Sequence, residues 1–257
     1  MKPSCRQPLG QIQSKSTKES KFKEINETWT ILCISKTIEH PMENKLKILC
    51  LHGYRQDGPT FRSKIGSLRK AFKNIIFDTV DAPHISNIPS HDAENKQDLA
   101  ASNPRSWWFT DTNKTYVSKI ESDIAECFEE SVSYIQDHVN KNGPYDGLFG
   151  FSQGATFAAL ICCLIQKGEF QANFKFVIIG AGFRSLCKPH LHYYNTKLVI
   201  PSLHIIGETD QVISKERCES LLEIFENPQI LRHPGGHYIP ASKEFKHVYK
   251  EFFDRFR

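Results

Sequence analysis

Short apolar runs recur along most of the chain, and segments with a helical period lie between them. The apolar runs predict strands at residues 46–52, 75–82, 145–150, 174–180, 201–207 and 229–233. These runs lack strict alternation, which is typical of strands buried on both faces of a sheet. The helical segments lie near residues 59–73, 117–140, 153–167, 214–226 and 242–256. This order predicts an α/β fold with a mostly parallel sheet of about six strands and helices on both faces.

Two stretches depart from this pattern. Residues 1–44 are polar, rich in Lys and Ser, and without a clear period, so we expect a disordered extension before a folded domain at residues 45–257. Residues 83–116 form a long connection, and its last part contains three consecutive aromatic residues, Trp107 to Phe109. A connection of this length is usually functional or disordered, and the aromatic run favours function.

The composition narrows the function classes. The net charge is +4, of which residues 1–41 carry +3, so the rest of the chain lacks the basic surface that nucleic-acid binding needs. No apolar run is long enough to span a membrane. The eight cysteines form no C-x-x-C pair, which favours reduced thiols and a cytoplasmic or nuclear protein. The sequence does not specify an oligomeric state.

The run Gly150-Phe151-Ser152-Gln153-Gly154 fits the pattern G-x-S-x-G. A short apolar strand precedes it and a strongly apolar helical segment follows it, as a nucleophile elbow requires. At such a bend the serine hydroxyl stands above the sheet edge, and glycines are needed because neighbouring backbone packs closely. The sequence therefore predicts Ser152 as a catalytic nucleophile.

A serine nucleophile needs a base and an acid that orients the base, and in this arrangement they follow in the order Ser, Asp or Glu, His. Glu208 and Asp210 follow the fifth predicted strand, and His237 follows the sixth. We favour Asp210 over Glu208 because it lies further from the strand end. We favour His237 over His233, which we expect to end the sixth strand. All three predicted triad residues would meet at the carboxyl edge of the sheet.

Further residues are expected around this triad. Backbone N–H groups of Tyr54 and Gln153 are the predicted oxyanion-hole donors, and we interpret His52 as a brace for the loop that carries Tyr54. Apolar side chains should line the site for the acyl chain, and the candidates are Trp107, Trp108, Phe183 and Tyr238. Each of the two tryptophans could instead belong to the hydrophobic core. The pair His190 and His192 has no third ligand at a suitable spacing, so the sequence predicts no metal site.

With these residues in place, the chain resembles the FSH-type serine hydrolases of the α/β-hydrolase superfamily, and it is particularly similar to the ovarian cancer-associated gene two esterases. The resemblance runs from about Lys45 to Phe256. It rests on seven blocks in order: KILCLHGYRQDG, FRSKIGSLRK, DAPH, RSWW, GPYDGLFGFSQGA, GETDQVIS and HPGGHYIP. Residues 1–44 precede the usual start of the family, and the family does not closely predict residues 90–104.

The resemblance implies the triad Ser152, Asp210 and His237 in an α/β-hydrolase core without a large lid domain. It also implies a carboxylesterase that acts through an acyl-enzyme on small-molecule esters with medium- to long-chain fatty-acyl groups, and no cofactor. Two other readings stay open. The same triad could serve a thioesterase or a peptidase, or the fold could be a non-catalytic binding protein, although the intact triad and both glycines argue against the last.

Overall fold

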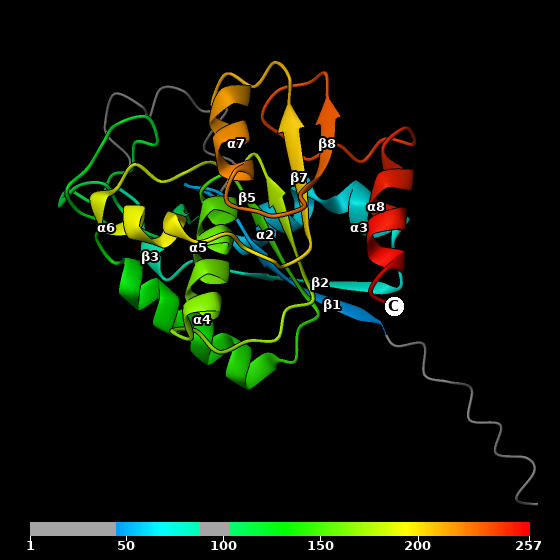
Figure 1. Cartoon of the computed structure of the whole chain (residues 1–257), viewed down its shortest axis with the longest axis horizontal. Coiled ribbons are helices and arrows are strands. Elements are labelled where there is room, and N and C mark those ends of the chain that lie inside the picture. The colour runs from blue at the N-terminus through cyan, green and yellow to red at the C-terminus, as the bar shows by residue number, and fades with distance from the viewer. Residues whose placement is uncertain (1–44, 88–102) are drawn as a thin grey trace, which may run out of the picture. The chain divides into compact units, whose positions relative to one another are not determined.

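A single parallel sheet organises the computed structural model, which describes residues 45–87 and 103–257 (Figure 1). Its strand order is β2-β1-β5-β6-β7-β8, and every neighbouring pair is parallel. This confirms the predicted parallel α/β sheet. The strands are β1 (Leu46–Leu51), β2 (Ile75–Val80), β5 (Gly147–Phe151), β6 (Phe176–Gly180), β7 (Ser202–Gly207) and β8 (Gln229–His233).

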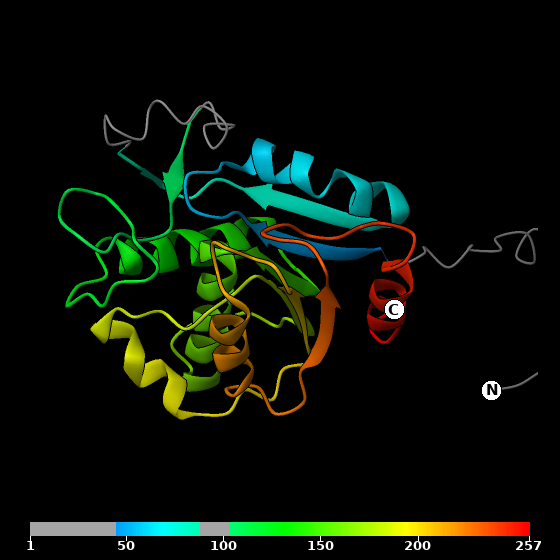
Figure 2. The same ribbon diagram turned by 90° about the horizontal axis from the view of Figure 1, so that it is seen from above.

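Helices cover both faces of this sheet (Figure 2). Helices α2 (Gly58–Lys64), α3 (Gly66–Ala71) and α8 (Lys246–Asp254) pack on one face, and α4 (Phe128–Asn142), α5 (Gln153–Lys167) and α7 (Lys215–Leu222) pack on the other. Successive strand residues alternate between the two cores; in β1, Leu49 faces α5 whereas Ile48 and Cys50 face α2. Burial on both sides explains why the strand sequences lack polar alternation.

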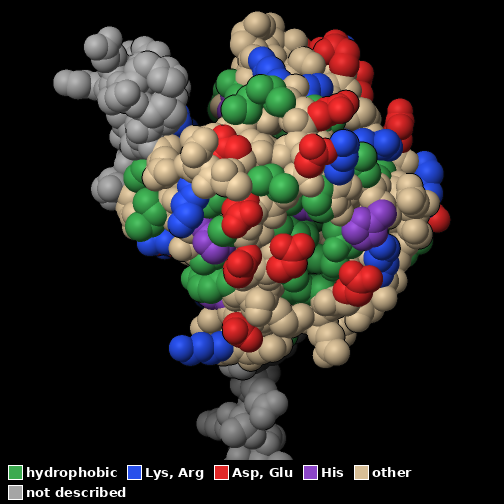
Figure 3. Space-filling view, turned by 90° about the vertical axis from the view of Figure 1, so that its left-hand side faces the viewer, with side chains coloured by type: hydrophobic (Ala, Val, Ile, Leu, Met, Phe, Trp, Pro, Cys, Tyr) green, Lys and Arg blue, Asp and Glu red, His purple; other side chains and the backbone are tan. Residues whose placement is uncertain are grey.

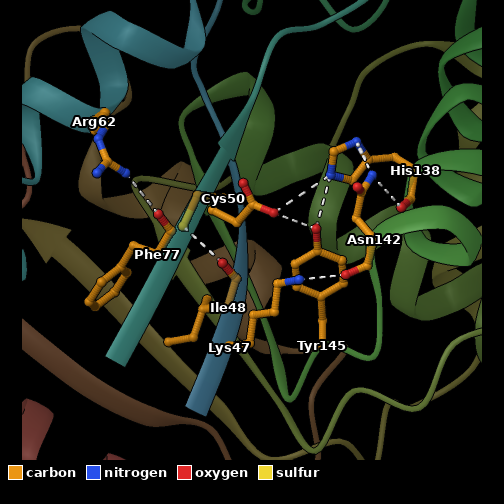
Figure 4. Close-up of polar contacts among 9 residues, drawn as sticks. Lys47, Ile48, Cys50, Arg62, Phe77, His138, Asn142 and Tyr145 are labelled. Atoms are coloured by element: carbon orange, nitrogen blue, oxygen red, sulfur yellow. Dashed lines mark hydrogen bonds and ion pairs between the residues drawn. The ribbon is translucent and has the colours of Figure 1, made fainter. Parts of the chain in front are cut away.

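Polar side chains join the end of α4 to the edge of the sheet (Figure 4). The His138 Nε2 of α4 lies 3.0 Å from the Tyr145 hydroxyl, which donates to the Asp78 carboxylate of β2. The Lys47 ammonium of β1 donates to the Asn142 carbonyl at the end of α4. These contacts fix the turn that leads into β5, the strand that carries the site described below.

Several elements differ from the prediction. The segment expected to form a helix near 117–140 becomes helical only at Phe128, because Ser122 is bound to other parts of the chain. Its hydroxyl lies 2.7 Å from the Thr110 carbonyl, and its backbone N–H donates to the Leu186 carbonyl at 3.2 Å. The predicted helix 59–73 divides into α2 and α3 at Ile65. Four short elements were not predicted: β3 (His84–Ile85), β4 (Arg105–Ser106), α6 (Lys188–Leu191) and the 3₁₀ helix η1 (His192–Asn195).

Some expectations concern parts of the chain that are not described. The extension at residues 1–44 and the middle of the long connection, residues 88–102, lie outside the described residues. Within residues 45–87 and 103–257, no helix is both long enough and apolar enough to cross a membrane. Figure 3 shows one face of the molecule, on which acidic and basic side chains are interspersed rather than separated into a basic surface.

Candidate active site

Ser152 lies at a sharp bend between β5 and α5. Its φ of 53° and ψ of −118° are unusual for a residue with a side chain, and such a conformation costs about 1–3 kcal/mol. The backbone N–H of Ser152 donates to the Gly180 carbonyl of β6 at 2.8 Å, which holds the bend against the sheet. This geometry is that of a nucleophile elbow.

The two glycines of the motif allow this bend to form. A Cβ atom at Gly150 would lie 2.2 Å from the Gly154 carbonyl oxygen, and a Cβ atom at Gly154 would lie 2.3 Å from the His52 carbonyl oxygen. Both obstacles are backbone atoms, which cannot move aside as a flexible side chain can. The close approach of β5, α5 and the end of β1 therefore requires glycine at both positions.

We expect Gly154→Ala to destabilise the protein by about 3 kcal/mol, because the added methyl group must push the end of β1 away from α5. Gly66→Ala is the matched control, since a Cβ atom at Gly66, the first residue of α3, meets nothing within 4 Å. It should be neutral or stabilise by up to about 1 kcal/mol. Urea unfolding of both variants measures the difference, and equal effects would contradict the proposed crowding at the elbow.

The predicted base and acid are in direct contact. His237 Nδ1 lies 2.7 Å from Asp210 Oδ2, and Asp210 Oδ1 accepts hydrogen bonds from the backbone N–H groups of Val212 and Ile213 at 2.8 and 2.9 Å. Burial of Asp210 favours its neutral form, but the hydrogen bonds from His237 and from these amides outweigh burial and lower its pKa. The carboxylate is therefore ionised at neutral pH and can orient the imidazole.

Ser152 and His237 both line a cavity of about 500 Å³. The His237 ring packs against the Phe151 ring with 4.7 Å between centroids, and its side chain is 19% exposed. Among the described residues no hydrogen bond joins the Ser152 hydroxyl to His237. In enzymes without bound substrate this bond is often long and shortens only when substrate binds. The fold thus brings the predicted nucleophile and base to one cavity.

Glu208 and His233, the alternative acid and base that the sequence offered, do not take part in the contact between Asp210 and His237. Glu208 forms ion pairs with Lys215 at 3.0 Å and with Arg232 at 3.4 Å. His233 is buried, and its ring packs against Tyr238 at 4.7 Å between centroids. Glu208 does not contact His237 as Asp210 does. These positions favour Asp210 and His237 as the catalytic pair.

His52 has the bracing position that the sequence suggested. Its Nε2 accepts a hydrogen bond from the Ala82 backbone N–H at 2.9 Å, and its Nδ1 lies 2.8 Å from the Gly53 carbonyl. Burial lowers the pKa of His52 to about 4, so the ring is neutral at physiological pH. Both ring nitrogens are engaged by backbone, which confirms the interpretation of His52 as a support for the loop after β1.

The two predicted oxyanion donors lie at the same edge of the sheet. Gln153 is the first residue of α5, so its backbone N–H has no partner within the helix. Tyr54 lies in the turn after β1 and lines the cavity, and its backbone N–H has no hydrogen-bond partner among the described residues. Two backbone hydrogen bonds join this turn to Arg105. The Arg55 N–H donates to the Arg105 carbonyl at 2.8 Å, and the Arg105 N–H donates to the Gln56 carbonyl at 3.0 Å.

The predicted acyl-site aromatics are placed mainly in the core. Trp107, Trp108 and Phe183 are almost completely buried, and none of them lines the cavity. Trp107 instead packs on the Phe157 ring of α5, and its Nε1 donates to the His52 carbonyl at 2.8 Å. The Phe183 carbonyl accepts a hydrogen bond from the Thr156 hydroxyl of α5 at 2.8 Å. Tyr238, by contrast, is half exposed and lines a smaller cavity of about 150 Å³ next to His237.

Trp107 and Trp108 nevertheless support the site through the Gln153 side chain. The Trp107 backbone N–H donates to Gln153 Oε1 at 3.1 Å, and Gln153 Nε2 donates to the Trp108 carbonyl at 2.8 Å. The side chain next to the nucleophile is thereby tied to the end of the long connection. These tryptophans position the elbow rather than line the cavity.

The cavity wall contains residues that the sequence did not single out. Its apolar part consists of Tyr116, Val117, Val212 and Ile213, and its basic part of Arg55, Lys64 and Lys119. The wall is therefore mixed, and not mostly apolar as expected. Val212 and Ile213 could have been found, because they follow Asp210 directly in the chain. Tyr116 and Val117 come from the irregular segment before α4, which gave no comparable signal.

Residues 42–249 match the family model described as serine hydrolase (FSH1). The chain belongs to this family. An esterase of Anopheles gambiae is 42% identical over 212 residues, which cover 82% of this chain and 78% of that protein. Esterase OVCA2 of Danio rerio is 39% identical over 226 residues, which cover 82% of this chain and 98% of that protein. The resemblance drawn from the sequence motifs is thus confirmed.

Solved structures identify the fold. Acyl-protein thioesterase 2 of Zea mays superposes with a TM-score of 0.56 at 18% identity, over 83% of this chain and 94% of that chain. At this identity the likeness concerns the fold alone. The parallel sheet with helices on both faces is an α/β-hydrolase fold, as predicted, and this FSH1-family member is a serine hydrolase.

Proposed function

We propose that this FSH1-family hydrolase cleaves carboxylic esters of fatty acids, with Ser152 as nucleophile, His237 as base and Asp210 as the acid that orients the base. The observation that carries the proposal is the shared cavity: Ser152 on its strained bend and His237, held by Asp210, line the same space. Relatives that cover most of this chain and are named esterases support an ester as the substrate.

The reaction follows from the positions of these groups. As the Ser152 oxygen attacks the ester carbonyl carbon, His237 Nε2 takes the hydroxyl proton, and Asp210 stabilises the resulting imidazolium through Nδ1–H. The negative charge that develops on the carbonyl oxygen is stabilised by the backbone N–H groups of Tyr54 and Gln153. His237 then gives its proton to the departing alcohol, which leaves an acyl group on Ser152.

The second half of the reaction removes this acyl group. Water takes the place of the alcohol and loses a proton to His237 as its oxygen attacks the acyl carbon. The carbonyl oxygen again receives hydrogen bonds from the two backbone amides. Collapse of this intermediate returns the proton to Ser152, and the carboxylic acid leaves the cavity.

The apolar part of the cavity wall is the proposed site for the acyl chain. Tyr116 and Val117 come from the segment before α4, Val212 and Ile213 follow Asp210, and all four line the cavity that Ser152 also lines. The basic side chains Arg55, Lys64 and Lys119 make up a polar part of the wall. The four apolar side chains supply contacts for an acyl chain.

We expect kcat/KM for p-nitrophenyl esters to rise from acetyl through butyryl to octanoyl and then to level off. Each buried methylene contributes about 0.8 kcal/mol, roughly fourfold per carbon. Val212→Ser should flatten this rise while sparing acetyl ester turnover. Val199→Ser is the matched control, because Val199 is 69% exposed and does not line the cavity.

The same panel separates the competing substrate classes. Efficiency that falls with every added carbon would contradict the fatty-acyl assignment. Acyl thioesters of matched chain length belong in the panel, because the same triad can cleave them. If every thioester is hydrolysed much faster than the matching oxygen ester, the protein is a thioesterase rather than an esterase of oxygen esters.

A further inference from the structure

Three side chains with metal-binding chemistry meet outside the active site. His84 belongs to β3, Cys127 directly precedes α4, and Glu130 lies in the first turn of α4. One potential ligand atom from each residue lies within 4.8 Å of the other two. None of the three lines the cavity that contains Ser152. The cluster therefore has no part in the proposed hydrolysis.

Cys127 has an unusual backbone for its residue type. Its φ of 66° and ψ of 16° are left-handed, a conformation that glycine adopts freely and residues with a side chain seldom do. It occupies the N-cap position of α4, where Ser, Asp or Asn would bind the first turn of the helix, but its side chain makes no capping hydrogen bond. Helix formation therefore accounts for neither the cysteine nor its strained backbone.

His84 supplies a second and independent observation. Its Nε2 atom is buried and has no hydrogen-bond partner among the described residues. A buried polar atom without a partner costs about 1–3 kcal/mol, so such atoms need an explanation. An imidazole nitrogen that carries no proton is also the commonest metal ligand in proteins.

We propose that His84, Cys127 and Glu130 bind a zinc ion, with a water molecule as the fourth ligand. Sulfur, nitrogen and oxygen donors together suit Zn²⁺, whereas calcium and magnesium prefer oxygen alone. Bonds of about 2.0–2.3 Å to a tetrahedral ion place ligand atoms roughly 3.3–3.8 Å apart, so the side chains need to move by only about 1 Å. The charge of the ion balances the Cys127 thiolate and the Glu130 carboxylate.

The surroundings of the cluster allow an ion to enter. Cys127 is partly exposed, whereas the other described cysteines are buried, and Glu130 is exposed. The bound ion would join β3 to the start of α4, because its ligands His84 and Cys127 come from these two segments and are more than forty residues apart in the chain. The proposed role is thus a structural cross-link.

Cobalt titration of the full chain, stripped of metal with a chelator, tests the proposal. Co²⁺ reports the site because thiolate ligation produces a near-ultraviolet charge-transfer band, and tetrahedral geometry produces intense visible bands. We expect both bands in the wild-type protein and their loss when Zn²⁺ is added. Glu130→Gln should weaken Co²⁺ binding at least tenfold, whereas Glu129→Gln, a neighbouring carboxylate outside the cluster, should not.

Cys127→Gly separates metal binding from folding. Glycine retains the left-handed backbone without strain, so the metal-free variant should melt no lower than the metal-free wild type. With free Zn²⁺ at 100 times its Kd, the folding equilibrium constant of the wild type should rise about 100-fold, and that of Cys127→Gly should not change. Absence of the near-ultraviolet band in the wild type, or an equal band in Cys127→Gly, would overturn the proposal.

Discussion

Ser152→Ala should lower kcat/KM for a p-nitrophenyl ester by about 10⁴–10⁶-fold without unfolding the protein. The hydroxyl is the only group of Ser152 that the proposed chemistry uses, and alanine has the same Cβ atom on the same bent backbone. His237→Ala should cause a loss of similar size, because without a base the hydroxyl is a weak nucleophile. Steady-state kinetics, with circular dichroism to confirm folding, measures both effects.

The double variant is the control for this prediction. Because nucleophile and base act as one unit, Ser152→Ala combined with His237→Ala should be little slower than either single variant. Losses that multiply would show that the two residues act independently. A Ser152→Ala enzyme that retains more than a tenth of wild-type activity would place the nucleophile elsewhere.

Asp210→Asn should lower kcat by about 10⁴-fold, the second largest effect that we expect. An amide cannot stabilise the imidazolium that forms during attack, and its N–H group would favour the wrong tautomer of His237. The Asp210 Oδ2 atom is 2.7 Å from His237 Nδ1, so the substitution acts directly on the base. Structural change should be small, because asparagine can still accept the backbone hydrogen bonds from Val212 and Ile213.

Glu208→Gln provides the matched control in the same loop. Glu208 is paired with Lys215 and Arg232 rather than with the base, so this variant should keep kcat within about twofold, as expected for a surface ion pair. Full activity of Asp210→Asn together with an inactive Glu208→Gln would reverse the assignment of the acid.

The sequence predicted the sheet and the nucleophile elbow because local chemistry determines both. Strands that are buried on both faces need short apolar runs without polar alternation, and few other structures require such runs. Glycine is required at positions 150 and 154 because a Cβ atom there would lie only 2.2 and 2.3 Å from backbone atoms. The positions of Asp210 and His237 followed from chain order and from the rule that parallel strands end at one edge.

The cavity wall could not be predicted in the same way. Tyr116 reaches the site because its backbone N–H donates to the Tyr54 hydroxyl at 3.2 Å, and the Ser86 hydroxyl donates to the same oxygen at 2.8 Å. These contacts join three segments that are distant in sequence, so the hydrophobic pattern of the sequence could not predict them. Trp107 and Trp108 were expected near substrate because aromatic residues suit both an acyl site and a core, and only the path of the chain decides between them.

Covalent labelling with a fluorophosphonate probe tests the central claim most directly. The probe phosphonylates a serine that a neighbouring base activates, and digestion followed by mass spectrometry identifies the modified residue. We predict one adduct, on Ser152 in the peptide that contains GFSQG, with labelling much slower in His237→Ala and Asp210→Asn than in Glu208→Gln. Ester hydrolysis by a wild-type protein that is labelled at another residue, or not labelled at all, would contradict the proposed catalytic triad.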